Sequence, residues 1–378
     1  MNCDKIKKQS IAKIVDTENV SKASRCSYIL TANVIKIERK GIKTMLRIKY
    51  EELLKEFERV LISRGFNEKN ALDAATVFAQ NSLDGIYSHG INRFPRVVEY
   101  LDKGEINPDV VATCEMSMGA IERWEGHRGF GPLNAKQAMD RAIELAKQHG
   151  IGMVALGNSN HWMRGGSYGW QAADAGCIGI CWSNTMPNMP AWGGEDQRIG
   201  NNPLVFAIPR SNGQHVVIDC AMSQFSCGKI EDYRLKGLQL PVPGGYDTSG
   251  QITRNPGEIY KTKRVLPMGF WKGSGISIAL DMIASVLTAG NAVHTIGTFE
   301  DEIGLSQMMI AIDPSKANTE EQTDAIVDGI LAYIKASKPI DEARPVLYPG
   351  EPEWQTMEEH RKNGIPVIEE KWNKVLAM

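Results

Sequence analysis

The sequence predicts a mixed α/β fold, in which an α/β core accompanies a largely helical domain built from the N- and C-terminal parts of the chain. Apolar residues recur with helical spacing from about residue 45 to residue 105, and helical patterns return at 319–336 and near 353–378. Short β-like runs, punctuated by glycine and asparagine, fill the middle of the chain. The Gly-x-Gly-x-x-Gly fingerprint does not occur, which disfavours a classical doubly wound dinucleotide-binding fold.

These patterns divide the chain into three parts. Residues 1–44 are rich in lysine and have no sustained period, so we expect an upstream extension with little part in the fold. Residues 45–120 together with 319–378 are predicted to form the helical domain. Residues 121–318 are predicted to form the α/β domain.

Three helices are predicted in the N-terminal region. The first has apolar residues on one face from Tyr50 onward and ends at Gly65. Asn67 can cap the second, which is broken by the YSHG stretch at 87–90. The third begins near Asn92 or Arg93 and runs to Gly104, with Pro95 in its first turn, where a missing N–H costs little.

The middle of the chain predicts one helix and then several strands. The helix covers 133–150 and ends at a glycine. Ser274 is expected to cap a further helix over 274–289. The predicted strands lie at 152–156, 177–182, 203–209, 215–221 and 306–313.

Composition excludes several classes of function. The 378 residues carry a formal net charge of -2 and no basic stripe, so nucleic acid is not an expected partner. No apolar run approaches the about 20 residues that span a bilayer, so a membrane is not expected either. Seven cysteines without a C-x-x-C pair, and no secretory signal, favour a reduced cytoplasmic protein. No His or Cys spacing suits a metal site, and no Gly-x-Ser-x-Gly suits a serine hydrolase.

His89 lies in the stretch YSHGINRFPR, and two interpretations are open. It is either a residue of a helix-terminating turn or the proton donor of an enzyme. Arg93 follows four residues later, close enough to share one short bend. A histidine with a free pKa of about 6.5 can protonate a carbonyl that gains charge during reduction. An arginine can hold the carboxylate of a 2-keto acid with two hydrogen bonds.

Three further residues are each open to a structural and a functional interpretation. His161 lies in a glycine-rich loop after a strand, as a backbone-bonded loop residue or a site residue. Lys272 lies in FWKGSGIS, which is either an anion site at a helix start or an ordinary capped helix. Asp219 ends a strand and either holds a ribose hydroxyl or caps a turn. Trp162 and Arg164, beside His161, suggest a polar substrate larger than lactate.

Six segments in this order resemble the malate/L-lactate dehydrogenase family that lacks the classical Rossmann fold: SHGINRFPR, GHRGFGP, GNSNHW, RIGNNPLVFAIP, VIDCAMS and LPMGFWKGSG. The resemblance covers about residues 45–378. It implies a non-Rossmann NAD(P)-binding core and a cytoplasmic homodimer that reduces a 2-keto sugar acid with NAD or NADP as cofactor, NADH being the one expected. It therefore accounts for the missing dinucleotide fingerprint.

The resemblance also assigns residues to roles. His89 is the implied proton donor, Arg93 the implied carboxylate ligand, and His161 and Asn202 are implied to line the substrate pocket. No metal is implied. The implied cofactor contacts are His215, Val216, Val217, Ile218, Asp219, Cys220, Ala221, Trp271, Lys272, Gly350, Glu351 and Pro352. Two departures stand out: Asn201 replaces the family's usual threonine, and residues 350–352 read GEP instead of a more polar GHE-like stretch.

Other functions remain open from the sequence. Within the family, the substrate can be another 2-keto acid or a cyclic imine acid. Outside catalysis, the chain can be a sugar-acid or nucleotide binding protein on the same fold. The retained histidine, arginine and lysine count against a binding protein.

Overall fold

Residues 45–378 of this computed structural model form one compact unit, and the structure describes all of them except residue 109. Residues 1–44 lie outside the described residues, and so does the expectation that they form an extension.

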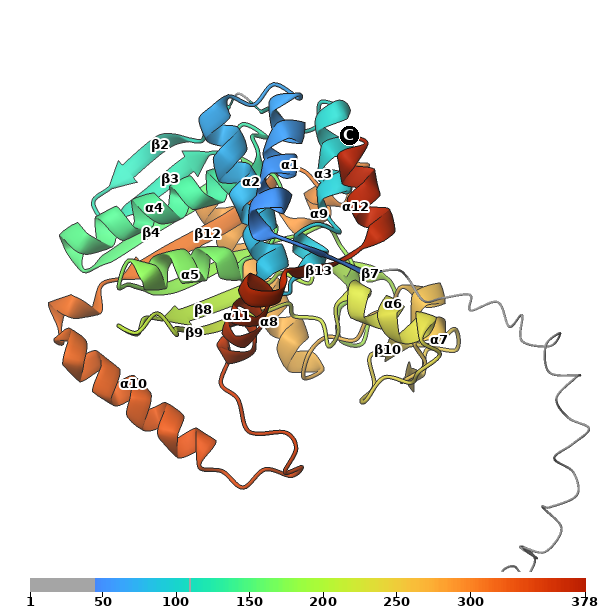
Figure 1. Ribbon diagram of the computed structural model, residues 1–378. Coiled ribbons are helices and arrows are strands. Elements are labelled where there is room, and N and C mark those ends of the chain that lie inside the picture. The colour runs from blue at the N-terminus through green and yellow to red at the C-terminus, as the bar shows by residue number, and fades with distance from the viewer. Residues whose placement is uncertain (1–44, 109) are drawn as a thin grey trace, which may run out of the picture. The chain divides into compact units, whose positions relative to one another are not determined.

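A seven-stranded mixed sheet lies at the centre of this unit (Figure 1). Its strands run in the order β2-β3-β4-β12-β5-β8-β9, and the pair β3–β4 is parallel whereas the other neighbours are antiparallel. A doubly wound fold would instead have a parallel sheet. The prediction of a mixed α/β fold is therefore confirmed. In sheet order the strands are Thr113–Met118, Ile121–Glu125, Ile151–Ser159, Leu305–Ile312, Ile178–Ser183, Leu204–Ile208 and Val216–Cys220.

Both faces of the sheet are covered, because its central strands alternate between two cores. Val154 and Leu156 of β4 pack with the helices α4 (Gly131–His149) and α5 (Gly166–Asp174). Ala155, between them, packs on the opposite face with α8 (Trp271–Thr288). The run of apolar residues in β4 therefore reflects a strand buried on both sides.

A helical layer packs around a separate core of aromatic and aliphatic residues. The rings of Phe57 and Phe94 lie 4.2 Å apart between centroids, and Phe78 meets Phe94 edge-on at 5.1 Å. The layer contains both ends of the described chain, since β1 pairs antiparallel with β13. Its elements are β1 Met45–Ile48, α1 Tyr50–Ile62, α2 Glu68–Leu83, η1 Tyr87–His89, α3 Phe94–Asp102, α11 Glu351–Asn363, β13 Ile365–Ile368 and α12 Glu369–Leu376.

The predicted helices of the N-terminal region are confirmed in detail. Asn67 caps α2, and its side chain accepts a hydrogen bond of 2.9 Å from the backbone N–H of Asn70. Pro95 lies in the first turn of α3. The helix predicted at 133–150 is α4, which ends at Gly150 in the left-handed conformation.

Two predicted helix boundaries are wrong. The helical pattern near 353–378 is interrupted by a strand that was not predicted, because Gly364 leaves the helical conformation at a φ of 82° and the following residues pair with β1. Helix α8 begins at Trp271, three residues before the predicted cap. The Ser274 hydroxyl instead accepts a hydrogen bond from the backbone N–H of Trp192, so it ties α8 to a neighbouring loop.

Strand β2 and helix α10 (Glu320–Lys335) fall within the ranges predicted for the helical domain. Strand β2 pairs within the central sheet, and Asp328 of α10 forms an ion pair with Arg210 just after β8. The domain division at residues 120 and 319 stays a prediction. The remaining elements are β6 Met189–Pro190, β7 Gln197–Ile199, α6 Cys227–Leu235, β10 Gly245–Tyr246, β11 Ile252–Thr253, α7 Pro256–Thr262, α9 Val293–Ile296 and η2 Pro314–Lys316.

Candidate active site

A cavity of about 490 Å³ brings together residues from distant parts of the chain. His89 and Arg93 reach it from the turn between α2 and α3, and His161 from the loop after β4. Glu302, just before β12, completes this group. In this group the structure thus unites His89, Arg93 and His161, which the sequence had indicated, with Glu302, which it had not.

The turn that carries His89 is held closely against α2. The hydroxyl of Ser82 accepts a hydrogen bond of 2.9 Å from the N–H of Ile91. The amide of Asn81 donates to the carbonyl of His89 at 3.0 Å. A side chain at Gly90 would place its Cβ 2.2 Å from the Ser82 hydroxyl oxygen, so glycine is required by this close approach. The backbone of His89 is therefore fixed before any ligand arrives.

A second anchor joins the same turn to the C-terminal helix α11. Nδ1 of the buried His360 lies 2.6 Å from the carbonyl oxygen of Leu83, so this nitrogen carries the proton and donates. Nε2 then accepts from the hydroxyl of Tyr87 at 3.1 Å. Both ends of the turn before His89 are thus fixed by one ring.

The tautomer of His161 follows from its hydrogen bond. Nδ1 of His161 accepts from the backbone N–H of Met163 at 2.9 Å, so in the neutral ring the proton is on Nε2. Nε2 lies 3.9 Å from Oε2 of Glu302. The ring also stacks on His89, with centroids 5.8 Å apart and an angle of 23° between planes. His161 thus bonds to the backbone and also lines the cavity, so its geometry is compatible with both interpretations, and its role as a site residue stays a prediction.

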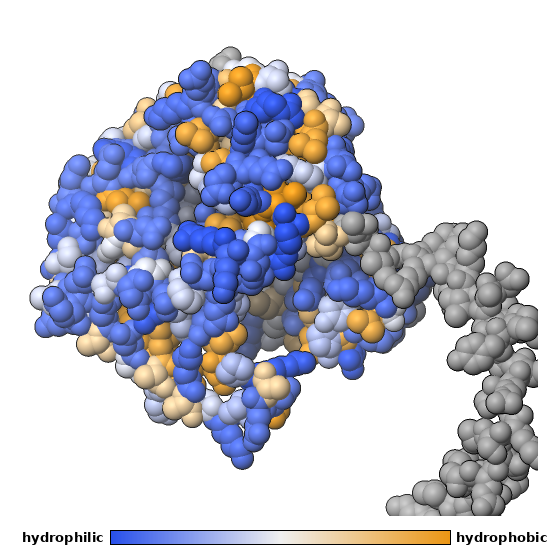
Figure 2. Space-filling view, in the orientation of Figure 1, coloured by the Kyte–Doolittle hydropathy of each residue, from blue (hydrophilic) through white to orange (hydrophobic). Residues whose placement is uncertain are grey.

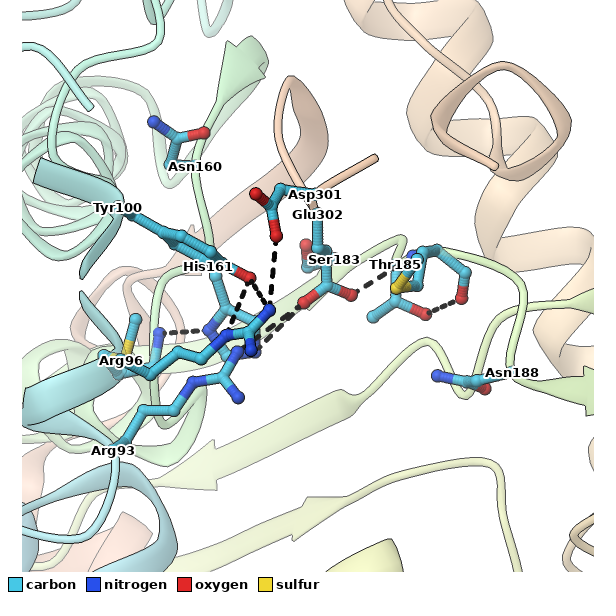
Figure 3. A network of polar contacts seen from close by, with 12 residues as sticks. Arg93, Arg96, Tyr100, Asn160, His161, Ser183, Thr185, Asn188, Asp301 and Glu302 are labelled. Atoms are coloured by element: carbon cyan, nitrogen blue, oxygen red, sulfur yellow. Dashed lines mark hydrogen bonds and ion pairs between the residues drawn. The ribbon is translucent and has the colours of Figure 1, made fainter. Parts of the chain in front are cut away.

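Arg93 and Glu302 form the charged pair of the cavity (Figure 3). Nη2 of Arg93 lies 3.9 Å from Oε2 of Glu302, which is too far for a hydrogen bond. Nε of Arg93 is buried and has no hydrogen-bond partner among the described residues. The guanidinium is therefore available to a ligand. Sequence analysis missed Glu302, although an acidic pair just before a predicted strand is a recognisable signal for the end of a sheet.

Burial changes the protonation of this cluster. It lowers the pKa of His89 to about 3, with His161, Arg93 and Arg164 adding to the effect. Burial, followed by the charge of Arg93, also lowers the pKa of His161 to about 3. Without ligand both rings are neutral at pH 7. The pKa of His89 in the free enzyme therefore lies well below the value of about 6.5 for a free histidine, which corrects the expectation from sequence.

Burial also raises the pKa of Glu302, while Arg93 and the N–H of Met186 favour its ionised form. Oε1 of Glu302 accepts from this N–H at 3.1 Å, which fixes the carboxylate in the cavity wall.

Asp219 and Arg164 line the cavity but have partners of their own. A carboxylate oxygen of Asp219 accepts from the N–H of Gly166 at 2.7 Å, at the start of α5. This supports the interpretation of Asp219 as a cap. Arg164 forms an ion pair with Asp84, so its charge is already neutralised.

Asn202 and Trp162 contribute mainly to packing. Asn202 is fully buried and is not among the residues that line the cavity. Its amide accepts from the N–H of Thr185 at 3.1 Å and donates to the carbonyl of Ser277 at 2.8 Å. Asn201, its neighbour, lines the cavity instead. Trp162 reaches the cavity wall, but it is 1% exposed and stacks on Tyr168. Asn202 thus supports the site without facing it.

Two of the three implied cofactor segments lie together. Strand β9, which contains residues 216–220, is an edge strand of the sheet, and the N–H of Val217 donates to the carbonyl of Pro349 at 3.0 Å. Gly350 has a φ of 95°, and a Cβ there would lie 3.0 Å from the backbone of both His215 and Val217. The loop before α11 therefore packs directly on β9. Asp219 and Ala221 of this segment face the cavity.

The side chains of His215 and Glu351 have structural contacts. The buried ring of His215 accepts from the N–H of Arg210 at 3.0 Å through Nδ1 and contacts Asp174 at 2.9 Å through Nε2. The carboxylate of Glu351 contacts Lys335 at 2.5 Å and accepts from the N–H of Tyr348 at 3.2 Å.

The third segment, Trp271 and Lys272, lies at the exposed start of α8. The N–H of Lys272 donates to Gly269 and that of Gly273 to Met268, so these groups are already partnered. A Cβ at Gly273 would lie 2.2 Å from the carbonyl oxygen of Met268. Gly273 therefore allows the start of α8 to pack closely against Met268.

Among the residues that the structure describes, no three His, Cys, Asp or Glu side chains gather as a metal site would require. No helix in the same residues is long and apolar enough to cross a membrane.

The model of the malate/L-lactate dehydrogenase family matches residues 48–376 of the chain. The chain belongs to the malate/L-lactate dehydrogenase family. This family member is an oxidoreductase. It is 48% identical to the 2,3-diketo-L-gulonate reductase of Escherichia coli K12 over 334 residues, which are 88% of this chain and 100% of that relative.

Solved structures of this family share the fold. The sulfolactate dehydrogenase of Methanocaldococcus jannaschii matches with a TM-score of 0.80 at 30% identity, covering 87% of this chain and 95% of that one. The malate dehydrogenase of Entamoeba histolytica matches with a TM-score of 0.83 at 25% identity, covering 88% and 97%. Enzymes with different named substrates therefore share this architecture, and the residues of the cavity must decide the substrate.

Proposed function

We propose that this chain reduces 2,3-diketo-L-gulonate to 3-dehydro-L-gulonate at the C2 carbonyl, with NADH as the expected cofactor and NADPH as the alternative. One observation carries the proposal. His89, Arg93 and His161 meet in a single cavity, in a chain 48% identical to a 2,3-diketo-L-gulonate reductase over that enzyme's whole length. An acid and a carboxylate ligand are the two groups that reduction of a 2-keto acid needs.

In this proposal Arg93 binds the substrate carboxylate. Its unpartnered Nε and its loose contact with Glu302 leave donors for two hydrogen bonds. A carboxylate on Arg93 offsets the cation and adds an anion near His89. Both changes raise the pKa of His89 from about 3. His89 then takes up a proton and gives it to the oxygen of the C2 carbonyl as negative charge develops there.

His161 orients the acid in the same proposal. Its stacked ring and its fixed tautomer keep His89 from turning toward the helical core. Asn202 holds the loop of Thr185 in place rather than touching substrate.

The cofactor would be held by residues 215–221, Trp271, Lys272 and residues 350–352. Two observations support the fit: the edge strand β9 leads into the cavity at Asp219 and Ala221, and Gly350 lets the start of α11 lie against that strand. The exposed ammonium of Lys272 suits a phosphate. A nicotinamide cofactor supplies the hydride when it is bound.

We also propose a cytoplasmic homodimer. Helices α8 and α10 carry exposed apolar residues, including Val286 at 76% and Tyr333 at 84% exposed. Hydrophobic atoms are visible in Figure 2 at the lower edge, where Figure 1 places α10. Exposed apolar residues of this size on a helix are typical of a protein interface. Sedimentation velocity tests the dimer, and a mass of one 41.8 kDa chain would contradict it.

A panel of keto acids assayed with NADH and with NADPH tests the reaction. We expect the highest kcat/KM for 2,3-diketo-L-gulonate, with smaller values for pyruvate, oxaloacetate and a cyclic imine acid. A higher value for one of these would replace the substrate but keep the reaction class. Binding of NADH and keto acid with no oxidation of NADH would instead favour a binding protein.

A further inference from the structure

Two oxygen atoms that line the cavity, on Asn188 and Glu302, receive no hydrogen bond from the described residues. Oδ1 of Asn188 is buried and has no partner among the described residues. Oε2 of Glu302 lies 3.9 Å from both Arg93 and His161, beyond hydrogen-bond distance. A buried acceptor without a donor is costly, so Oδ1 of Asn188 favours a ligand that brings a donor, and Oε2 of Glu302 can accept from the same ligand. Hydroxyl groups are such donors.

The charged side chains that line the cavity also limit which ligands it can bind. Two guanidinium groups line it, but Arg164 is committed to Asp84, which leaves Arg93 to receive a ligand carboxylate. Three carboxylates line the same space: Asp219, Glu302 and Glu353. A substrate with one carboxylate therefore finds one cation. The second carboxylate of a dicarboxylic acid meets acidic groups instead.

The position of Glu302 lets it discriminate between ligands with one carboxylate and ligands with two. It is the carboxylate that the structure places beside Arg93, and its Oε1 is held by the N–H of Met186. Its side chain is 12% exposed, so repulsion between it and a ligand carboxylate is weakly screened. Rejection by an unfavourable contact adds to the selectivity that attractive contacts give.

We propose that Glu302 selects hydroxylated monocarboxylates over dicarboxylates, because its free oxygen accepts a hydrogen bond from a substrate hydroxyl and repels a second carboxylate. The inference rests on the proposed function in one respect, namely that Arg93 receives the substrate carboxylate. It adds a specificity-determining residue to that cavity.

The test is Glu302→Gln, which keeps the shape of the side chain and removes its charge. Dissociation constants of 2-keto-L-gulonate and 2-oxoglutarate are measured by calorimetry on enzyme saturated with NAD⁺, which cannot reduce a keto acid. Each ligand places one carboxylate on Arg93, so the ratio of the two constants cancels changes at that arginine. In Glu302→Gln we expect the ratio of the two dissociation constants to change about tenfold in favour of 2-oxoglutarate. A hydrogen bond to a charged group contributes to binding on that order.

Asp301→Asn is the matched control, because Asp301 is the adjacent carboxylate but pairs with Lys103 and Arg96 and does not line the cavity. Its ratio should stay at the wild-type value. An unchanged ratio in Glu302→Gln, or an equal change in both variants, would overturn the inference. Turnover of 2,3-diketo-L-gulonate by the wild type is measured separately. If turnover is absent while the binding ratio still changes, the selectivity stands and the proposed reaction fails.

Discussion

Two short stretches of this chain look alike in sequence but differ in the structure. Each combines glycine with a basic residue at the start of a helix: His89 and Arg93 before α3, and Lys272 at the start of α8. In the first, Gly90 packs on Ser82 and the basic side chains face a cavity. In the second, Gly273 packs on Met268 and the lysine lies exposed.

The difference is in what surrounds each stretch. The first is enclosed by α2, by the loop of His161 and by Glu302, which together lower the solvation of every charge. The second stretch lies at the surface, where the side chain of Lys272 is exposed to solvent. We therefore expect changes at the first stretch to alter chemistry, and changes at the second to alter only the affinity for the cofactor.

The largest effect is expected from His89→Ala. Loss of the proton donor should lower kcat about 1,000-fold, while the affinity for NADH measured by fluorescence stays the same. His127→Ala is the control, because His127 is another loop histidine and contacts Thr113 outside the cavity. Turnover near the wild-type rate in His89→Ala would show that another group is the acid.

Arg93→Lys is expected to raise KM for the keto acid about 100-fold, because an ammonium cannot replace two parallel hydrogen bonds to a carboxylate. KM for NADH should not change. Arg96→Lys is the matched control, since Arg96 pairs with Asp301 and does not line the cavity. Similar KM values for both variants would contradict the role given to Arg93.

The enclosed position of His89 also predicts a pH dependence. Its pKa is about 3 in the free enzyme, so the protonated fraction falls as pH rises above that value. If the acid must be protonated, kcat/KM for reduction should fall about tenfold per pH unit between about pH 5 and pH 8. A plateau up to pH 6.5 would mean that the ring titrates like a free histidine.

Lys272→Ala should have a smaller effect, because an exposed charge contributes up to about 1 kcal/mol. We expect KM for NADH to rise about fivefold and kcat to stay constant. Lys236→Ala, a second exposed lysine beyond α6, provides the control. A large loss of kcat in Lys272→Ala would remove the distinction between the two stretches.

The two stretches are also expected to differ in how replacing a glycine changes the free energy of unfolding. Gly90→Ala should lower the free energy of unfolding by about 1–3 kcal/mol, because its Cβ would overlap the Ser82 hydroxyl. Gly275→Ala should raise it by up to about 1 kcal/mol, since this helical position has open space around it. Urea denaturation measures both. Equal destabilisation by the two changes would contradict the packing described for Gly90.

Much of the fold was predictable because it depends on local periods. The helices of the N-terminal region and five strands of the sheet, β4, β5, β8, β9 and β12, each carry a pattern of apolar residues that a single element imposes, whereas β2 and β3 were not predicted. Strand β13 was missed within the helical pattern near 353–378, because it is stabilised by pairing with β1, which is about 320 residues away in sequence and leaves no local period. The start of α8 failed because a loop contact, not a cap, uses Ser274.

The sequence by itself determined the N-terminal helices, five strands of the central sheet, the absence of a Rossmann fingerprint and the short list of basic residues that could act on a keto acid. The tertiary structure alone decided which of them share a cavity, that Asn202 supports the wall instead of facing it, and that Glu302 joins the site. It also decided the protonation of His89 and His161, because their desolvation and the nearby charge of Arg93 depend on which segments the fold brings together.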